Sequence, residues 1–204
     1  MLTKIIKDSI QNFRYKQVYR KWLAAGQPIP IPDAVKQSIV KDYAKRYGID
    51  VFVETGTYLG DMVYALQESF SAIYSIELSP ALYEKAGIKL SNYKHISLFQ
   101  GDSSVVLPNI LDLIKAPCIF WFDAHYSEGV TAKGKKETPI LEELEYIFRH
   151  PVTNHIILID DARLFTGNSD YPTLESLKAL IVSNYPENVF IVKDDIIRTY
   201  KNTT

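Results

Sequence analysis

Residues 51–60, which read VFVETGTYLG, decide the fold of this chain. An apolar run suited to a β-strand ends in the carboxylate of Glu54, and a turn with two glycines follows it. Gly56 permits a tight turn, and Gly60 lets the following helix approach the strand closely. The free amides at the start of that helix face the space above the turn. The segment therefore predicts a strand, a tight turn and a helix N-terminus beside a ligand.

The same alternation continues along the chain. Apolar runs suited to strands lie at residues 51–53, 72–76, 95–99, 118–122 and 155–159. Helical patterns lie between them at about 60–70, 80–91, 103–115 and 138–149. Alternating strands and helices predict a parallel sheet with right-handed crossovers. Several runs are apolar on both faces, which predicts that helices cover both sides of the sheet.

The end of the chain has a different pattern. Residues 189–192 and 196–200 are both suited to strands, and only three residues separate them. This spacing predicts an antiparallel hairpin. The expected fold class is therefore α/β, with a doubly wound, mostly parallel seven-stranded sheet, a C-terminal antiparallel hairpin and an N-terminal helical extension.

The N-terminal region is basic and helical in pattern. Residues 1–25 hold six Lys and Arg residues against one Asp, and their apolar residues recur at helical spacing. The apolar stripe of this helix either packs on the body of the protein or forms a lid, a dimer contact or a membrane-surface helix. The proline-rich stretch 27–32 ends it, and a second helix is expected over 33–47. We expect a helical extension over 1–47 and an α/β domain over 48–204.

Composition excludes several classes of protein. The chain has 204 residues, 23 Lys and Arg against 24 Asp and Glu, and one cysteine, Cys118. A formal net charge of −1 argues against a nucleic-acid partner, because such proteins are basic. A single cysteine excludes an intramolecular disulfide. Since no uncharged run approaches the ~20 residues needed to span a bilayer, we expect a cytoplasmic protein without stable membrane insertion.

Acidic residues follow every strand of the expected parallel sheet. They are Glu54, Glu77, Asp102, Asp123 and the pair Asp160 and Asp161. Carboxylates cost several kcal/mol to desolvate unless they are paired, so a core offers no reason for this pattern. Ligands of open α/β sheets bind at the carboxyl ends of the strands. The pattern therefore predicts a ligand site along that edge.

The first loop limits what the ligand is. The nicotinamide fingerprint G-x-G-x-x-G is absent because the loop reads GTYLG, and no P-loop lysine follows. Glu54 and Glu77 are 23 residues apart, a spacing that suits a strand-end carboxylate reaching ribose hydroxyls. These features favour a ligand with ribose and no phosphate.

Residues 53–60, Ile76-Glu77 and Gly101-Asp102-Ser103 together resemble the cofactor motifs of class I S-adenosylmethionine-dependent methyltransferases. The resemblance covers roughly residues 45–200 and implies their Rossmann-like fold. Tyr58 departs from it, since the family has a small residue there. By this resemblance Glu54 lies near the methionine amino group, Glu77 binds the ribose, and Asp102 with Ser103 binds the adenine. The loop under the cofactor is then formed by Thr55, Gly56, Thr57 and Gly60. A second interpretation of Asp102 is that it only caps the next helix.

A second group of carboxylates comprises Asp123, Asp160 and Asp161. The fourth and fifth strands are expected to be neighbours, so these like charges would repel unless a cation lay between them. Mg²⁺ prefers such oxygen ligands. The arrangement resembles metal-dependent O-methyltransferases that act on catechols and antibiotic sugars, which implies a metal that holds the acceptor hydroxyls. The alternative is that Asp160 or Asp161 caps a turn and pairs with Arg163.

His125 is the general base that the sequence favours, because it lies two residues beyond Asp123 and titrates near neutral pH. It could instead be hydrogen-bonded in a loop or be a further metal ligand. Residues 126–137 form either a mobile loop over the site or a solvated loop. Glu142 and Glu143 face either the acceptor or solvent.

These residues predict an S-adenosylmethionine-dependent O-methyltransferase in which Asp123 and His125 act on the acceptor and Mg²⁺ assists. The expected acceptor is a hydroxyl of a small molecule, such as a sugar or another natural product. The alternative is a non-catalytic protein of the same fold with a binding or regulatory role. A homodimer through the N-terminal helix is a further expectation.

Overall fold

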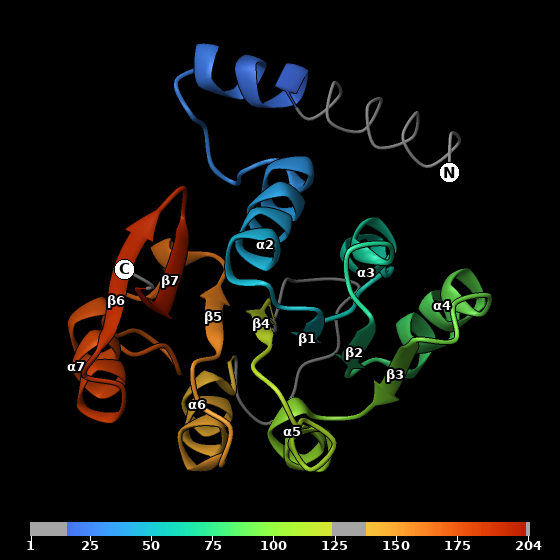
Figure 1. The fold of residues 1–204 in the computed structure, drawn as a ribbon. Helices are drawn as coiled ribbons and strands as arrows, with labels where there is room; N and C mark the ends of the chain where they lie inside the picture. The colour runs from blue at the N-terminus through green and yellow to red at the C-terminus, as the bar shows by residue number, and fades with distance from the viewer. Residues whose placement is uncertain (1–15, 124–137, 203–204) are drawn as a thin grey trace.

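A computed structural model describes residues 16–123 and 138–202 (Figure 1). His125 and residues 126–137 therefore lie outside the described residues, as does the first part of the N-terminal helix. A single seven-stranded sheet has the order β3-β2-β1-β4-β5-β7-β6. Its strands are β1 (Val51–Thr55), β2 (Ala72–Glu77), β3 (Ile96–Gln100), β4 (Ile119–Phe122), β5 (Ile156–Ile159), β6 (Asn188–Lys193) and β7 (Ile196–Lys201).

The pairing of the strands confirms the predicted fold class. The strands β1 to β5 are parallel, and β7 runs antiparallel to both β5 and β6. The order reverses between β1 and β4, which pair in parallel. Ligands of open α/β sheets bind at the carboxyl ends of the strands at such a reversal point. The fold thus selects the edge that holds Glu54 and Asp123.

Helices cover both faces of this sheet. They are α2 (Asp33–Tyr47), α3 (Asp61–Leu66), α4 (Pro80–Leu90), α5 (Ser103–Leu111), α6 (Ile140–Arg149) and α7 (Leu174–Asn184), with a 3-10 turn η1 (Ala162–Leu164). Figure 1 shows α2 and α3 on one side of the sheet and α5 and α6 on the other. Helix α7 was not predicted from the sequence, although Thr173 caps it by accepting a hydrogen bond from the Ser176 amide.

The two central strands are apolar on both faces because each face is covered. All four residues of β4, IFWF, are buried, and so are all four residues of β5, IILI. Trp121 and Leu158 belong to the core on the α2 and α3 side, whereas Phe120 and Ile157 belong to the core on the α5, α6 and α7 side. This packing fixes the ends of β4 and β5, from which the acidic residues extend.

A two-residue turn joins β6 to β7. Asp194 and Asp195 both have a φ of 54°, which is the left-handed backbone that a type I′ hairpin turn requires at both central positions. The Asp194 carboxylate accepts a hydrogen bond of 2.6 Å from the Arg198 guanidinium. Asp195 accepts one of 2.9 Å from the Arg163 amide. The hairpin predicted from the sequence thus brings an acidic residue to the loop after β5.

The described part of the N-terminal extension shares a core with the sheet. Residues 16–24 are helical, and Trp22 donates a hydrogen bond of 2.8 Å from its indole Nε1 to the Pro28 carbonyl. Trp22, Val35 and Val40 are buried in the same apolar core as Phe52 and Trp121. Trp22 therefore packs on the body, whereas the packing of the apolar stripe in residues 1–15 stays a prediction, because those residues lie outside the described ranges. In the ranges described, no helix is long and apolar enough to cross a membrane.

The packing of Trp22 predicts a large loss of stability when it is truncated. Replacing a buried aromatic residue by Ala removes its transfer free energy and leaves a cavity. We expect Trp22→Ala to lower the free energy of unfolding by about 3–5 kcal/mol in urea denaturation. The control Ile88→Ala, at a side chain that is 78% exposed, should change it by less than about 0.5 kcal/mol. Equal effects would contradict a shared core.

Candidate functional site

Glu54 lies at the end of β1 and is almost completely buried, with 1% of its surface exposed. Its Oε2 atom accepts a hydrogen bond of 2.6 Å from the Ser75 hydroxyl on β2. Burial raises the pKa of Glu54 to about 8, and the charges of Asp123 and Glu77 add to the effect. A carboxyl group that is costly to ionise here would ionise readily once a cationic ligand group lay beside it.

The turn between β1 and α3 follows the backbone path that its glycines predict. Gly56 has a φ of 91° and Gly60 a φ of 71°, and a Cβ atom at Gly60 would lie 3.1 Å from the Leu90 side chain. Tyr58 also has a positive φ, of 50°, a conformation that a non-glycine residue adopts rarely. Thr57 is buried and its hydroxyl lies 2.5 Å from that of Ser75. The loop therefore closes tightly over the ends of β1 and β2.

Glu77 ends β2 and holds this loop in place. Its Oε2 accepts a hydrogen bond of 2.7 Å from the Tyr58 amide, and its Oε1 accepts one of 2.8 Å from the Ser79 amide. Burial raises the pKa of Glu77, and these backbone hydrogen bonds offset part of the increase. A carboxylate has about four acceptor positions. The geometry thus leaves acceptor capacity on Glu77 for a further donor.

Asp102 caps α5, which is the second interpretation given to it from the sequence. Its Oδ1 accepts hydrogen bonds from the Ser104 amide at 3.0 Å and from the Ser104 hydroxyl at 2.7 Å. Ser103, the first residue of α5, is buried. The capping contact is therefore confirmed. The contact of Asp102 and Ser103 with an adenine ring stays a prediction.

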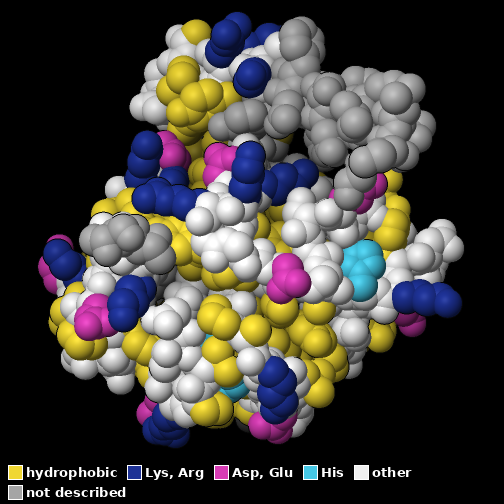
Figure 2. Space-filling view, in the orientation of Figure 1, with side chains coloured by type: hydrophobic (Ala, Val, Ile, Leu, Met, Phe, Trp, Pro, Cys, Tyr) yellow, Lys and Arg dark blue, Asp and Glu magenta, His cyan; other side chains and the backbone are white. Residues whose placement is uncertain are grey.

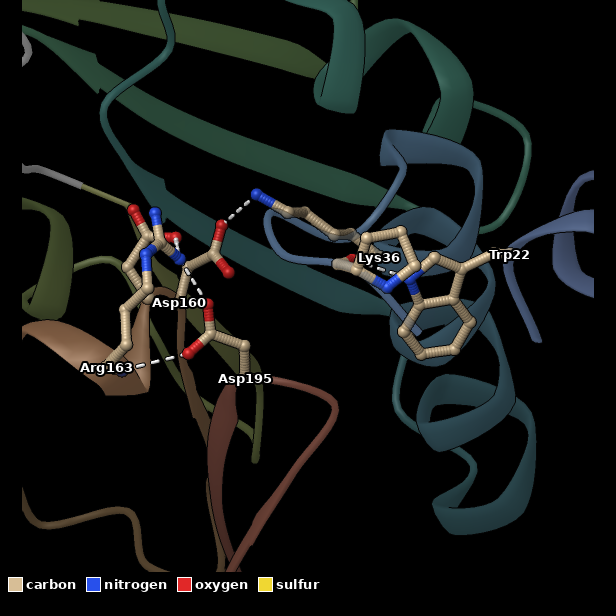
Figure 3. Close-up of polar contacts among 7 residues, drawn as sticks. Trp22, Lys36, Asp160, Arg163 and Asp195 are labelled. Carbon is tan, nitrogen blue, oxygen red and sulfur yellow. Dashed lines mark hydrogen bonds and ion pairs between the residues drawn. The ribbon is translucent and has the colours of Figure 1, made fainter. Parts of the chain in front are cut away.

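The carboxylates of Asp123, Asp160 and Asp161 come together, as the sequence predicts. One oxygen from each lies within 4.8 Å of the others. The sequence did not predict that a lysine from the N-terminal extension reaches them. The Lys36 ammonium on α2 forms an ion pair with Asp160 Oδ2 (Figure 3).

A second cation lies on the other side of this cluster. Arg163 donates a hydrogen bond of 2.6 Å to Asp161 Oδ1 and also pairs with Asp195. Its pairing with Asp161 is the alternative that the sequence left open for that residue.

Burial and neighbouring charges shift the pKa values of both Lys36 and Asp160. Burial raises the pKa of Asp160 to about 7, the charge of Asp123 raises it further, and Lys36 offsets part of the increase. Burial acts to lower the pKa of Lys36, but the carboxylates of Asp160, Asp123 and Asp161 outweigh it and raise the pKa. The ammonium is thus held in its charged form by all three carboxylates.

A cavity that is open to solvent lies beside the acidic cluster. Aromatic and acidic side chains make up most of its wall. The lining residues are Phe122, Asp123, Thr138, Ile140, Glu143, Ile159, Asp160, Asp161, Phe165 and Tyr171. The rings of Phe165 and Tyr171 meet edge to face with their centroids 5.3 Å apart. Apolar walls with a few polar groups are typical of small-molecule sites.

Two buried carboxylate oxygens in this wall have no hydrogen-bond partner among the described residues. They are Glu143 Oε1 and Asp160 Oδ1, in residues that are 1% and 4% exposed as a whole. A buried polar group without a partner is costly. The two atoms therefore mark positions where a ligand with hydrogen-bond donors would be favoured.

Glu143, which the sequence left facing either the acceptor or solvent, is buried and lines the cavity. Its burial could have been predicted, because Ile140, Glu143, Leu144 and Ile147 form the buried stripe of α6, and a carboxylate within an apolar stripe is exceptional. Burial raises the pKa of Glu143 to about 7, and the nearby hydroxyl side chains of Ser103 and Thr55 offset part of the increase. Glu143 therefore lies between the cavity and the residues at the carboxyl ends of β1 and β3.

No protein-family model matches this chain, and no curated protein matches it in sequence. Its fold, however, is shared with solved structures. TomG, an O-methyltransferase of tomaymycin synthesis from Streptomyces achromogenes solved with S-adenosylmethionine, is 13% identical with a TM-score of 0.61, over 93% of this chain and 89% of that chain. The methyltransferase PaMTH1 from Podospora anserina, solved with S-adenosylhomocysteine, is 16% identical with a TM-score of 0.60, over 97% and 96%.

A third solved structure of this fold is an O-methyltransferase from Bacillus cereus in complex with S-adenosylhomocysteine. It is 15% identical with a TM-score of 0.59, over 92% of this chain and 90% of that chain. The fold is therefore that of the class I S-adenosylmethionine-dependent methyltransferases, as the sequence motifs imply. At these identities the likeness concerns the fold alone.

The burial of Glu54 predicts a pH dependence of stability. The pKa of Glu54 is about 8 in the folded protein and has its ordinary value of 4.5 in the unfolded chain. The folded protein therefore binds more protons than the unfolded chain between these values. Stability should fall as pH rises from about 4.5 to 8, by a few kcal/mol from this residue. We expect Glu54→Gln to reduce this fall in urea denaturation from pH 5 to about 8.5.

The exposed Glu84 on α4 provides the matched control. Glu84→Gln should leave the pH dependence of the wild type unchanged. A Glu54→Gln protein that loses as much stability with pH as the wild type would contradict the assignment of this effect to Glu54.

Proposed function

We propose that this protein transfers a methyl group from S-adenosylmethionine to a hydroxyl group of a small molecule. The observation that carries the proposal is the joint placement of Glu54, the 56–60 turn and Glu77 beside the acid-lined cavity, at the reversal point of a methyltransferase fold. A nucleoside-binding edge and an acceptor cavity thus lie next to each other. Methyl transfer needs that adjacency, because it is an in-line displacement between two bound partners.

The residues at the ends of β1 and β2 fit the cofactor by charge and by hydrogen-bonding capacity. S-adenosylmethionine would supply a methyl group on a positively charged sulfur. Glu54 is a buried acid whose ionised form would be stabilised by an adjacent α-ammonium group. Glu77 would accept hydrogen bonds from the ribose hydroxyls, while its present contacts keep the 56–60 loop in shape. Asp102 and Ser103 would border the adenine.

Glu143 is the described residue that best suits the removal of the hydroxyl proton. Glu143 lines the cavity, its buried Oε1 has no hydrogen-bond partner among the described residues, and a base with a pKa of about 7 is well matched to proton transfer near neutral pH. This role replaces neither Asp123, whose carboxylate lines the same cavity, nor His125. The assignment of His125 as general base stays a prediction, because that residue lies outside the described ranges.

One observation supports a bound Mg²⁺ at this site, and another argues against it. The oxygens of Asp123, Asp160 and Asp161 form a donor set of the kind that hard cations prefer. The Lys36 ammonium, however, already pairs with Asp160, and Arg163 pairs with Asp161. The site as it stands therefore does not fit a divalent ion unless Lys36 moves, and the proposed reaction includes no step through a metal.

A small acceptor is favoured over a nucleic acid by charge. Lys and Arg side chains are interspersed with Asp and Glu side chains on the face shown in Figure 2, and the chain has a formal net charge of −1. Binding to a phosphate backbone depends instead on clustered basic residues. The aromatic walls and the carboxylates of the cavity suit a hydroxylated small molecule, because the carboxylates would accept hydrogen bonds from its hydroxyl groups.

The cofactor assignment predicts binding of S-adenosylmethionine that depends on Glu77. We expect isothermal titration calorimetry to detect saturable binding to the wild type. Glu77→Gln should weaken it roughly 10- to 100-fold, because hydrogen bonds to a charged group are worth about 1.5–3 kcal/mol. The exposed Glu84→Gln should bind as the wild type does. A wild type that binds no S-adenosylmethionine would exclude the proposed function.

The role of Glu143 predicts a separation of binding from turnover. Glu143→Gln should keep its affinity for S-adenosylmethionine within about threefold and lose roughly 10²- to 10⁴-fold in kcat, the usual contribution of a general base. The wild-type rate should rise with pH up to about 7 and then level off, since the carboxylate must be ionised. Turnover would be followed as release of S-adenosylhomocysteine with hydroxylated acceptors. Full activity of Glu143→Gln would rule the role out.

A further inference from the structure

We propose that the ammonium group of Lys36 is the resident cation of the Asp123, Asp160 and Asp161 cluster and takes the place of a divalent metal ion there. The N-terminal extension would then supply a positioning residue to the site. The proposal concerns the site of the proposed function, but it is a statement about cation binding and does not require that methyl transfer occur.

The position of Lys36 is fixed by the fold. It lies in the first turn of α2, beside Val35, which is buried in the core shared with β1 and β4. Its side chain is 12% exposed, and that of its partner Asp160 is 1% exposed. Figure 3 shows the lysine extending from α2 toward the Asp160 carboxylate, away from Trp22. A lysine that is anchored by core packing differs from a surface lysine with a mobile head group.

The charge balance of the cluster favours this single cation. The carboxylates of Asp160, Asp123 and Asp161 all act on the Lys36 ammonium, and Arg163 pairs with Asp161 from the other side. An incoming divalent ion would meet the positive charge of Lys36 within the same cluster, in a partly desolvated place where charges interact strongly. Binding of a metal therefore requires that the ammonium leave Asp160.

Lys36 also has the donors to do part of a metal's work. An ammonium group has three N–H donors, and Asp160 Oδ2 accepts from one of them. Asp160 Oδ1 remains without a partner among the described residues, in the wall of the cavity. Asp160 lines the cavity and Lys36 does not, so the ammonium would act through Asp160. It would keep that carboxylate ionised and in position beside the hydroxyl of the methyl acceptor without any added ion.

The test is the binding of Mg²⁺ alone to the full chain, measured by isothermal titration calorimetry. We expect Lys36→Met to bind one Mg²⁺ at least about tenfold more tightly than the wild type, because removing the ammonium frees the carboxylates. The double variant Lys36→Met with Asp160→Asn should lose this gain. Lys36→Arg should resemble the wild type, since the positive charge is retained.

The matched control is Lys45→Met, which removes an exposed lysine from the last turn of the same helix. It should leave Mg²⁺ binding unchanged. Binding of S-adenosylmethionine, measured on every variant, separates a failure of this proposal from a failure of the proposed function. Unfolding curves identify any variant that does not fold, and Lys36→Gln then replaces Lys36→Met.

Two results would overturn the proposal. One is a wild type that binds Mg²⁺ as tightly as Lys36→Met does and loses that binding in Asp160→Asn, because the metal and the ammonium would then coexist. The other is a folded Lys36→Met protein that binds Mg²⁺ no more tightly than the wild type. The first point is decided by titrating the wild type, Asp160→Asn and a folded Lys36 variant side by side.

Discussion

The parallel pairing of β1 with β2 on one side and with β4 on the other determines where everything else in the site lies. The strand order reverses at β1 and β4, and ligands of open α/β sheets bind at the carboxyl ends of the strands at such a point. The Asp123 amide donates to the Thr55 carbonyl at 3.0 Å, so the pairing holds to the last residue. Glu54 and Asp123 leave the sheet from this point, and the cofactor edge and the cavity lie on either side of it.

Carboxylates buried at that edge are costly, and the structure offsets the cost only in part. Glu77 has amide donors, Glu54 has one hydroxyl donor, and Asp160 has an ammonium. Glu143 and Asp160 each keep a buried oxygen without a partner among the residues described. Incomplete satisfaction of this kind is expected at functional sites more than in a core. It is the physical reason to regard the edge as built for a ligand.

Local sequence patterns predicted most of the fold and the placement of Glu54, Glu77 and the 56–60 turn at one edge of the sheet, because these depend on residues close together in the chain. The strand ends at Glu54 and Glu77 and the 56–60 turn follow from hydrophobic runs and glycine positions. The lysine at position 36 could not be assigned in this way. Its partner is 124 residues away, and nothing in the pattern of residues 33–47 distinguishes it from a solvated helix lysine.

Glu143 is an intermediate case, since its place in the stripe of α6 was visible but its neighbours Ser103 and Thr55 were not. The helix α7 was missed although Leu174, Leu177 and Ile181 have helical spacing. Here the pattern was present and the proline, glycine and polar residues before it obscured the start. The contacts between elements far apart in the chain are therefore the main part of the site that the sequence pattern could not predict.

The ion pair between α2 and the end of β5 also bears on the order in which the site forms during folding. Contacts between residues far apart in sequence require closure of a long loop, which costs entropy before the contact forms. The lysine is synthesised before Asp160 and before the hairpin that carries Asp195. During synthesis from the N-terminus, the ammonium stays hydrated until β5 has emerged and paired. The acidic cluster and its counter-charge therefore come together only after the central part of the sheet has formed.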